Sequence, residues 1–512
     1  MLLVERLNEA KGEASVAVVR RQLNIISMSP VYEPYAYTAI AIDPATKKMN
    51  YVVIEPTLLD NEKRILARIK EALMDELDVD LKSLADIKSA EKYLRDAVER
   101  IVKKYKIKLP YPETLNKLLY YAIRDFVGYG KIDAFMRDHM VEDISCDGVG
   151  IPIYVWHREY ESLPTNVVFE SDEELNSFVI RLAYRCGKHV SIAQPILDAA
   201  LPDGSRVNIT YSREVSRRGS SFTIRRFRSD PLTISDLIMF NTLSAEMAAY
   251  YWMLIEHKLS LIVAGGTATG KTTLLNCLAM FIKPDYKIIT VEDTAELNIP
   301  HENWLSMVTR TGWATGVAEV TIFDLLKTAL RQRPDYVVVG EVRGAEAYTL
   351  FHAMATGHGG LCSIHADSVQ AVIHRLESEP MNIPRSLLTL LDDVILLKRV
   401  QVGGKPVRRI AVNTEIVALD PKTKEILTSD TYTWNPHGDT YTFSGRSYVL
   451  EKIVKMSNLS LDEVREELAR RRLVLEWMVR KGIRSFKEVG AVVKEYYADP
   501  AKTYRRARMD LT

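Results

Sequence analysis

Long apolar runs and helical spacings of apolar residues alternate along the second half of the chain. Residues 259–264, 287–291 and 336–339 are three such runs, which is typical of strands buried on both faces. Between residues 272 and 282 the apolar side chains recur at three- and four-residue steps, which predicts a helix soon after the first run. This alternation continues to about Leu397. We therefore predict an α/β core built on a parallel-rich sheet.

The first half of the chain has shorter and more mixed patterns. Residues 1–60 begin with a charged segment and contain Pro30 and Pro34 in a tyrosine-rich stretch, with strand-like alternation at 49–54. We expect a partly flexible N-terminal arm followed by one strand. Helical spacing then predicts a small helical bundle over 61–106.

Further elements complete an N-terminal α+β domain over residues 61–228. A helix is expected at about 112–127, and a second one begins with a capping box of Ser171 and Glu174 and ends near Gly187. Strand-like segments are expected at 143–148, 151–156, 206–211 and 221–227.

The chain's 512 residues are too many for one hydrophobic core. Residues 229–231, Ser-Asp-Pro, are the best candidate for a hinge linker, which leaves 232–512 as a C-terminal domain. Its α/β core is followed by a β-rich segment at 409–449. Two helices are expected to close the chain, each opened by a capping box: Ser460 with Glu463, and Ser485 with Glu488.

Composition excludes several classes of protein. Hydrophobic residues make up 47% and charged residues 26%, and the net charge of +1 argues against a surface built as a whole to hold nucleic acid. No apolar stretch approaches the ~18 residues of a membrane span, so we expect a soluble cytoplasmic protein. The four cysteines form no C-x-x-C pair, so no zinc site is indicated.

Residues 265–272 fit the phosphate-binding pattern G-x-x-x-x-G-K-[ST], between a predicted strand and a predicted helix. Backbone N–H groups and the helix start would face a polyphosphate, Lys271 would supply a cation, and the Thr272 hydroxyl would bind Mg²⁺. The other interpretation is a glycine-rich turn that holds no ligand. We predict bound ATP and Mg²⁺, with these residues at the nucleotide: Gly265, Gly266, Thr267, Ala268, Thr269, Gly270, Lys271, Thr272 and Thr273.

Two further apolar runs end in carboxylates. Glu292 and Asp293 follow one, and Glu341 follows another with Arg343 just after it. Ligands of doubly wound sheets bind at the carboxyl ends of strands, so these acids are candidates for metal binding and water activation, although a single strand-end acid is more often a helix cap or a solvated charge. A third segment carries His358 and His365 around an apolar run.

In order and spacing these motifs resemble the secretion ATPase superfamily, the hexameric motors of type II secretion, type IV pili and archaeal surface filaments. The Walker A motif is 265–272, the aspartate box 288–296, the Walker B region 330–343 and the histidine box 356–365. The match covers about 126–397. The resemblance implies a RecA-like ATPase core in which Glu292 is the general base.

The same resemblance assigns the other site residues. Glu341 helps to hold Mg²⁺ and its water, and His365, together with His358, senses the γ-phosphate. Arginines of the N-terminal domain reach the γ-phosphate across a domain cleft or a subunit interface, and Arg206 and Arg225 match those positions. Guanidinium suits this role because it stays charged and binds phosphate oxygens in pairs.

The arginine-rich stretch has a plainer interpretation as well. Residues 206–228 could be a solvated hairpin or a nucleic-acid patch. We favour the γ-phosphate role for Arg206 and Arg225, and the roles of Arg226 and Arg228 stay open.

The N-terminal half is similar to the archaeal branch of the family, in particular the archaellum motor ATPase. Segments 128–130, 141–148, 151–158 and 341–344 match its signatures. The tetracysteine zinc motif of many bacterial members is absent, and Thr294 replaces their aspartate-box proline.

The resemblance implies a homo-hexamer, peripheral at the cytoplasmic membrane face, that drives a polytopic membrane platform, with accessory cytoplasmic motor proteins as further partners and no nucleic acid. The alternatives are an archaeal pilus or adhesion-filament ATPase and a RecA-like nucleic-acid translocase. A GTPase is disfavoured because no N-K-x-D motif occurs.

Overall fold

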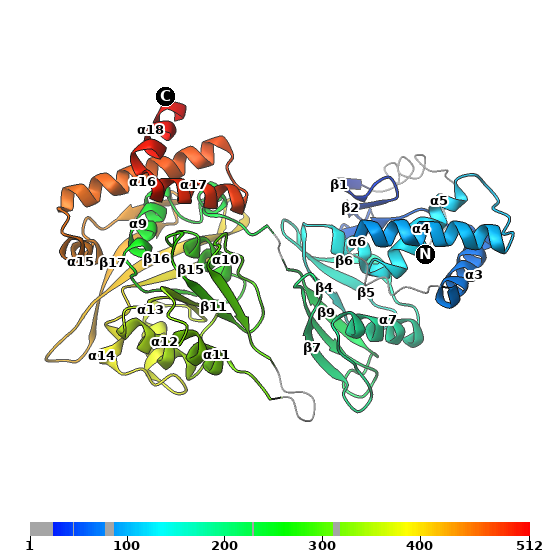
Figure 1. The fold of residues 1–512 in the computed structure, drawn as a ribbon, viewed down its shortest axis with the longest axis horizontal. Helices are drawn as coiled ribbons and strands as arrows, with labels where there is room; N and C mark the ends of the chain where they lie inside the picture. The colour runs from blue at the N-terminus through cyan, green and yellow to red at the C-terminus, as the bar shows by residue number, and fades with distance from the viewer. Residues whose placement is uncertain (1–23, 45, 77–86, 228–229, 311–317, 512) are drawn as a thin grey trace. The chain divides into compact units, whose positions relative to one another are not determined.

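The computed structural model describes residues 24–44, 46–76, 87–227, 230–310 and 318–511 (Figure 1). The chain divides into two compact units, Met1–Phe227 and Arg228–Thr512, called here the N-terminal and C-terminal units. The predicted fold class is confirmed. It combines an α+β unit that contains a helical bundle with a RecA-like α/β unit.

The N-terminal unit is built on a mostly antiparallel sheet in the order β1-β2-β3-β6-β5-β4-β9-β8-β7. Its strands are β1 (Asn24–Tyr32), β2 (Ala36–Ile42), β3 (Met49–Ile54), β4 (Val141–Cys146), β5 (Pro152–His157), β6 (Glu161–Val168), β7 (Ile196–Ala200), β8 (Arg206–Thr210) and β9 (Ser221–Arg225). Alternate residues of β5, β8 and β9 are buried, as expected when one face of a sheet meets a core. Helix α7 (Asp172–Arg185) packs against that face, and Phe178 contacts Phe222 of β9 at a ring separation of 5.2 Å.

The predicted helical bundle is present. It consists of α3 (Asp60–Glu76), α4 (Ile87–Lys104) and α5 (Thr114–Phe126), which bury one face each in a shared core that includes Ile69, Val98 and Leu118 (Figure 1). The short helix α6 (Asp133–Arg137) follows and leads into β4. Ser171 caps α7 by accepting the N–H of Glu174, as predicted, whereas the Glu174 carboxylate accepts the N–H of Glu170 rather than that of Ser171.

The sequence-based expectation of an open segment before residue 49 is wrong for residues 24–42. β1 and β2 pair antiparallel there. Pro30 fits because β1 is an edge strand, where a missing N–H costs no ladder bond. The tyrosines that suggested a loop are packed instead, with Tyr32 and Tyr35 each about 6 Å from the ring of Tyr120 on α5. Residues 1–23 of the predicted arm lie outside the described residues.

The C-terminal unit contains a second sheet, in the order β12-β11-β13-β14-β10-β15-β16-β17-β18. The strands from β12 to β15 in this order run parallel, and the last three are antiparallel. The parallel strands are β10 (Leu261–Gly265), β11 (Ile288–Glu292), β12 (Trp304–Val308), β13 (Tyr336–Val339), β14 (Gly359–Ile364) and β15 (Asp393–Val402).

Helices cover both faces of this sheet. On β10, Leu261 and Val263 belong to one core while Ile262 and Ala264 belong to the other, as expected for a strand buried on both sides. The helices of the first core include α8 (Ile234–Met239), α9 (Ala245–Glu256) and α10 (Lys271–Ala279). Those of the second are α11 (Ile322–Leu330), α12 (Glu346–Ala355), α13 (Val369–Glu377) and α14 (Arg385–Leu388).

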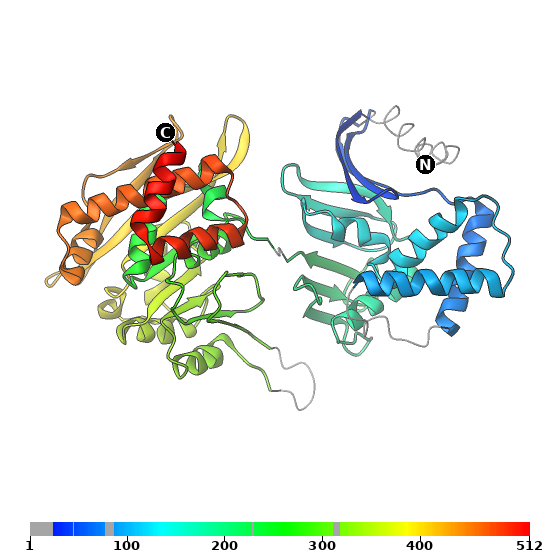
Figure 2. The same ribbon diagram turned by 45° about the horizontal axis from the view of Figure 1, so that its top comes forward.

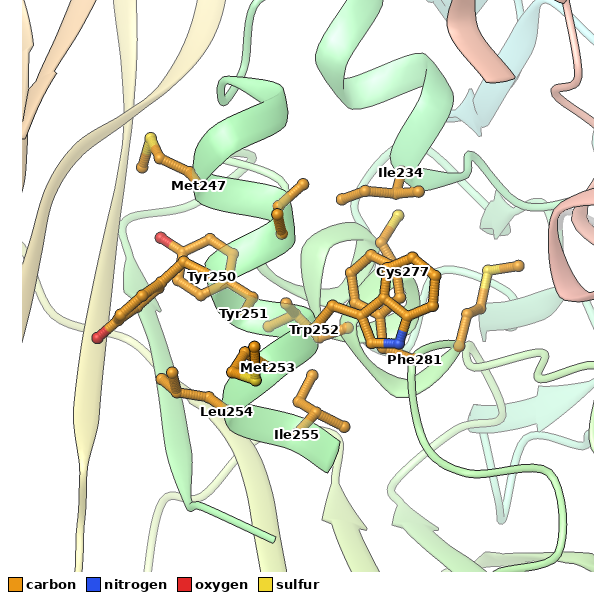
Figure 3. Packing of buried hydrophobic residues seen from close by; sticks show 14 of the residues in the cluster. Ile234, Met247, Tyr250, Tyr251, Trp252, Met253, Leu254, Ile255, Cys277 and Phe281 are labelled. Atoms are coloured by element: carbon orange, nitrogen blue, oxygen red, sulfur yellow. The ribbon is translucent and has the colours of Figure 1, made fainter. Parts of the chain in front are cut away.

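Helix α9 is buried along its whole length except for the two glutamates, Glu246 and Glu256. Figure 3 shows Tyr250 and Tyr251 pointing to one side of this helix and Trp252 to the other. Trp252 stacks on Phe281 with ring centroids 5.0 Å apart and planes 7° from parallel. Helix α9 is therefore packed between the sheet and the neighbouring helices, with apolar side chains on all of its sides.

The C-terminal extension is larger than predicted. Its β-rich part begins at β15, continues through β16 (Lys405–Leu419), β17 (Ile426–Asn435) and β18 (Thr440–Phe443), and ends before α15 (Tyr448–Ser457). Three more helices follow, α16 (Leu461–Lys481), α17 (Phe486–Ala498) and α18 (Pro500–Leu511). α18 contacts both α16 and α17, and α16 contacts α9 (Figure 2).

One of the two predicted capping boxes is confirmed. Ser460 and Glu463 bond each other's backbone N–H groups at the start of α16. The Ser485 box is wrong because the Ser485 side chain makes no cap bond, and the N–H of Phe486 is directed to Asp230 instead. Within the described residues, no helix has the length and apolar character needed to cross a membrane.

Candidate nucleotide-binding and hydrolysis site

The predicted phosphate-binding loop joins β10 to α10. Gly270 is the N-cap of α10 at φ +93°, in the left-handed region that favours glycine. Gly265 has no room for a side chain, since a Cβ would lie 2.8 Å from the carbonyl oxygen of Leu397 on β15. Ala268 is at φ +58°, an uncommon conformation for a residue with a Cβ. The loop therefore has the tight curvature that lets backbone N–H groups face a phosphate.

Two side chains of the loop fold back onto Gly266. The Thr269 hydroxyl donates to the Gly266 carbonyl at 3.0 Å, and Lys271 Nζ donates to the same oxygen at 2.8 Å. Thr272 and Thr273 are half-buried in the first turn of α10. Two contacts within the loop therefore help to hold its shape, and the Lys271 ammonium group lies against its backbone.

Strand direction gathers the other candidates at the same edge of the sheet. β10, β14, β13 and β11 are consecutive neighbours and run parallel. Glu292 is the last residue of β11, Glu341 lies two residues after β13, and His365 follows β14. All three therefore lie at the carboxyl ends of strands, as the loop does, where doubly wound sheets bind ligands.

Glu292 is buried, and its two carboxylate oxygens differ. Oε1 accepts the backbone N–H groups of Glu296 and Leu297, each at 3.0 Å. Oε2 is buried and has no hydrogen-bond partner within the described residues. Burial raises the pKa of Glu292 to about 7, which outweighs the lowering by the two N–H donors. This carboxyl is oriented by one oxygen and can exchange a proton near neutral pH through the other.

Glu341 is half-buried and ion-paired. Arg343 Nη2 lies 2.6 Å from Glu341 Oε2, and Arg343 Nη1 lies 3.8 Å from the Asp293 carboxylate. Ser363 Oγ donates to the carbonyl of Gly340 at 2.6 Å, which ties the segment before Glu341 to β14. Asp293, Glu341 and Arg343 form one charged cluster after β11 and β13.

The two histidines of the predicted γ-phosphate sensor are separated. His365 is exposed at the carboxyl end of β14, and its carbonyl accepts a hydrogen bond from Arg375. His358 precedes β14, and its Nδ1 lies 2.7 Å from the Pro334 carbonyl before β13. The 6 residues of β14 lie between the two histidines, which separates them by about 23 Å at about 3.3 Å per residue. The structure therefore does not bring His358 to the candidate site together with His365.

The two predicted arginines belong to the N-terminal unit and lie next to each other. Arg206 of β8 is directly opposite Arg225 of β9, and Arg225 is opposite Asp143 of β4. Arg206 binds Asp198 of β7 through two hydrogen bonds, Nε to Oδ1 at 3.1 Å and Nη2 to Oδ2 at 2.6 Å. The sheet register thus places a pair of guanidinium groups between two carboxylates.

Arg226, whose role the sequence left open, has internal partners. Its Nη2 donates to the Met136 carbonyl at 2.6 Å, and its Nη1 donates to the carbonyls of Asp138 and Val141. Arg226 therefore holds the turn between α6 and β4 together. Arg228 lies outside the described residues.

One contact of the phosphate-binding loop was not found from the sequence. Nε of Arg408, on β16, donates to the carbonyl of Ala268 at 3.0 Å. The two residues are 140 positions apart, so no local motif could indicate the contact. The only signal in the sequence is the arginine pair 408–409 at the start of the predicted β-rich segment.

Comparisons with known proteins place this geometry in a family. Residues 131–489 match the family described as type II/IV secretion system protein. The chain is 37% identical over 492 residues to the uncharacterized protein MJ0900 of Methanocaldococcus jannaschii, which covers 91% of this chain and 88% of that protein. It is 50% identical over 234 residues to MJ1287 of the same organism, which covers 46% of this chain and 87% of that protein. The X-ray structure of the ATPase DotB from Yersinia pseudotuberculosis is similar over 70% of this chain and 90% of that chain, with 18% identity and a TM-score of 0.41. Because the family match spans most of its length, this chain belongs to the type II/IV secretion ATPase family.

Proposed function

We propose that this protein is a Mg²⁺-dependent ATP-hydrolysing motor that drives the assembly or rotation of an archaeal surface filament, the archaellum, at the cytoplasmic face of the membrane. The proposal of ATP hydrolysis rests on one observation. The phosphate-binding loop, Glu292, Glu341 and His365 all lie at the same edge of one sheet. Membership in a secretion ATPase family supports the motor role. The extended similarity to an archaeal protein supports an archaeal filament.

The loop and two oxygen donors fit a nucleotide with its metal. Lys271 is at the start of α10, where it can contact the β- and γ-phosphates. The Thr272 hydroxyl and the Glu341 carboxylate are hard oxygen ligands, which Mg²⁺ prefers together with phosphate oxygens. A bound Mg²⁺ would neutralise charge on the phosphates. In that complex Glu341 would exchange its partner Arg343 for the metal and its water.

Glu292 is the best candidate for the general base. The attacking water oxygen forms a bond to the γ-phosphorus while the bond to the ADP oxygen breaks, and the water proton passes to Oε2 of Glu292. This oxygen has no hydrogen-bond partner within the described part of the chain. A base is most effective when its pKa lies near the working pH, and that of Glu292 is about 7. His365 would contact the γ-phosphate from the end of β14.

Arg206 and Arg225 would supply positive charge from the N-terminal unit. In the proposed homo-hexamer they reach the γ-phosphate across a domain cleft or a subunit interface, and residues 229–231 act as the hinge. The movement would be passed to a polytopic membrane platform, with accessory cytoplasmic motor proteins as further partners. The adjacent positions of the two arginines on β8 and β9 support a shared role.

The partners of the arginine-rich stretch argue against nucleic-acid binding. Arg206 is paired with Asp198, and Arg213 is paired with Asp172 at 2.8 Å. Arg226 binds backbone carbonyls. Arg226 is thereby taken up by contacts within the unit, and the net charge of the chain is only +1, so the motor proposal does not include DNA or RNA.

The experiment compares the ATPase rate of the full-length protein in four conditions: alone, with vesicles that contain an archaellum platform protein, with vesicles that contain a pilus or adhesion-filament platform, and with single-stranded DNA. We expect stimulation by the archaellum platform only, and no activity of Glu341→Gln in any condition. Stimulation by the pilus platform alone would reassign the motor to that filament. Stimulation by DNA alone would overturn the proposal in favour of a translocase.

A further inference from the structure

Arg408 contacts the phosphate-binding loop at two points. Its Nε donates to the carbonyl of Ala268 at 3.0 Å. Its Cδ lies 3.3 Å from the place where a Cβ on Gly270 would be, so the aliphatic part of the side chain lies against the next glycine of the loop. Within the described residues, the Ala268 carbonyl is the only hydrogen-bond partner of the Arg408 guanidinium.

The orientation of the Ala268 carbonyl determines the direction of the next N–H group of the loop. A peptide unit is planar and trans, so its C=O and N–H groups point in opposite directions. Because Arg408 binds the Ala268 oxygen, the N–H of Thr269 points away from Arg408, toward the side on which the proposed phosphate would lie. Ala268 also has a left-handed backbone, which a residue with a Cβ adopts only when its surroundings hold it there.

Arg408 is itself held in place by its neighbour. Arg409 is 4% exposed and binds both carboxylate oxygens of Asp439 at 2.7 Å. The same guanidinium donates to the backbone carbonyls of Phe240 and Arg408. A β-bulge between β15 and β16 lies at Leu396 and Leu397, next to the start of the loop, and shifts the register of the segment that carries both arginines.

We propose that Arg408 is a positioning residue for the phosphate-binding loop. It holds the peptide between Ala268 and Thr269 with its N–H toward the polyphosphate, so that nucleotide affinity depends on the hairpin of β15 and β16. This inference rests on the proposed nucleotide binding at 265–272. Because the contact orients a loop N–H that would bind phosphate in the ground state, its effect is on the binding of ground-state phosphates rather than on the chemical step.

The test measures MgATP and MgADP affinity together with kcat for Arg408→Ala, Arg408→Lys and a control, Lys405→Ala. Lys405 is an exposed cation on the same strand, and within the described residues its side chain makes no hydrogen bond or ion pair with the loop. We expect Arg408→Ala to weaken both affinities about tenfold, the effect of losing one hydrogen bond to a charged group, with kcat at saturation nearly unchanged. Arg408→Lys should recover most of the affinity, and Lys405→Ala should match the wild type. Unchanged affinity in Arg408→Ala, or an equal loss in Lys405→Ala, would overturn the proposal.

Amide hydrogen exchange in the nucleotide-free protein separates this proposal from the proposed function. Arg408→Ala should accelerate exchange at residues 266–270 and leave the exchange of β10 and the melting temperature unchanged. Slow exchange in the loop of Arg408→Ala would contradict the positioning role even if nucleotide binding is established. Failure of the wild-type protein to bind nucleotide would overturn the proposed function, while the exchange comparison would still decide whether Arg408 orders the loop.

Discussion

Arg206 is bound to Asp198 through two parallel hydrogen bonds, from Nε to Oδ1 at 3.1 Å and from Nη2 to Oδ2 at 2.6 Å. Both side chains are partly exposed, at 43% and 32%, so the guanidinium is accessible although it is paired. Carboxylate and phosphate present similar pairs of oxygens to a guanidinium fork. Asp198 therefore holds the Arg206 guanidinium in a fixed orientation, in which a phosphate could replace the carboxylate.

Replacing either Arg206 or Arg225 by alanine should reduce kcat by about 10³-fold with hexamers intact, because an arginine at the transition-state phosphate is worth that much or more. The matched control is Arg213→Ala, which removes an exposed arginine that is also paired with a carboxylate. The measurement is steady-state ATPase activity with the oligomeric state checked by light scattering. Nearly normal turnover in both Arg206→Ala and Arg225→Ala would support the other interpretation, in which these arginines are solvated surface charges.

The pKa of Glu292 predicts a specific pH dependence. Since the carboxylate is the active form of a base, kcat should rise with pH through about 7 and then level off. Folding stability should change in the opposite direction. Burial raises the pKa above its unfolded value, so the folded state binds the proton more tightly, and stability should fall as pH rises from about 4.5 to about 7.

The variant Glu292→Gln tests both effects of this titration. It should abolish the rising limb of kcat together with most of the activity, and it should flatten the stability profile between the same pH limits, as measured by urea unfolding. Glu302→Gln is a suitable control because Glu302 is exposed and its ion pair with Lys494 is on the surface. A wild-type kcat that is independent of pH between 5.5 and 8 would argue against Glu292 as the base.

Lys271→Ala and Glu341→Gln should have different effects on MgATP binding, although both should stop turnover. Lys271 would contact phosphates in the bound ground state, so its loss should weaken MgATP binding strongly and stop turnover. In the proposed mechanism Glu341 would act on the metal and its water, so Glu341→Gln should keep binding within a few-fold and lose turnover. Equilibrium titration with a fluorescent ATP analogue distinguishes the two. Equal loss of binding in both variants would contradict the assignment of Glu341.

Local patterns allowed the edge of the sheet that holds the candidate site to be predicted, because parallel strands bring their carboxyl ends together whatever the rest of the fold does. Glu292 and Glu341 were placed correctly for this reason. His358 and His365 lie at opposite ends of β14, and only the direction of that strand shows which of them is at the candidate site. Arg408 and the partner of Phe486 depend on contacts between distant segments, which spacing along the chain does not reveal.

The two histidines provide a further test of this geometry. His358→Asn should leave kcat within about twofold of wild type, since the side chain contacts the Pro334 carbonyl at the end of the sheet away from the loop. His365→Asn should lower kcat by at least about tenfold, as expected for a lost contact with the γ-phosphate. ATPase assays at saturating MgATP decide between them. A large loss of turnover in His358→Asn with an unchanged melting temperature would require a catalytic role that its position does not explain.

The start of β1 at Asn24 defines two informative truncations of the N-terminal segment, whose residues 1–23 lie outside the described residues. Deleting residues 1–23 keeps β1 whole, whereas deleting residues 1–28 removes its first half, including Ile25 and Met28, which pack with Ala39 and Ile54. If the charged start docks a membrane partner, the shorter deletion should preserve ATP binding, hydrolysis and hexamers but abolish filament function in cells. The longer deletion should in addition lower the melting temperature, because it opens the paired edge of the sheet. Loss of ATPase activity in the shorter deletion would mean that the segment is structural, and normal filament function would mean that it docks no essential partner.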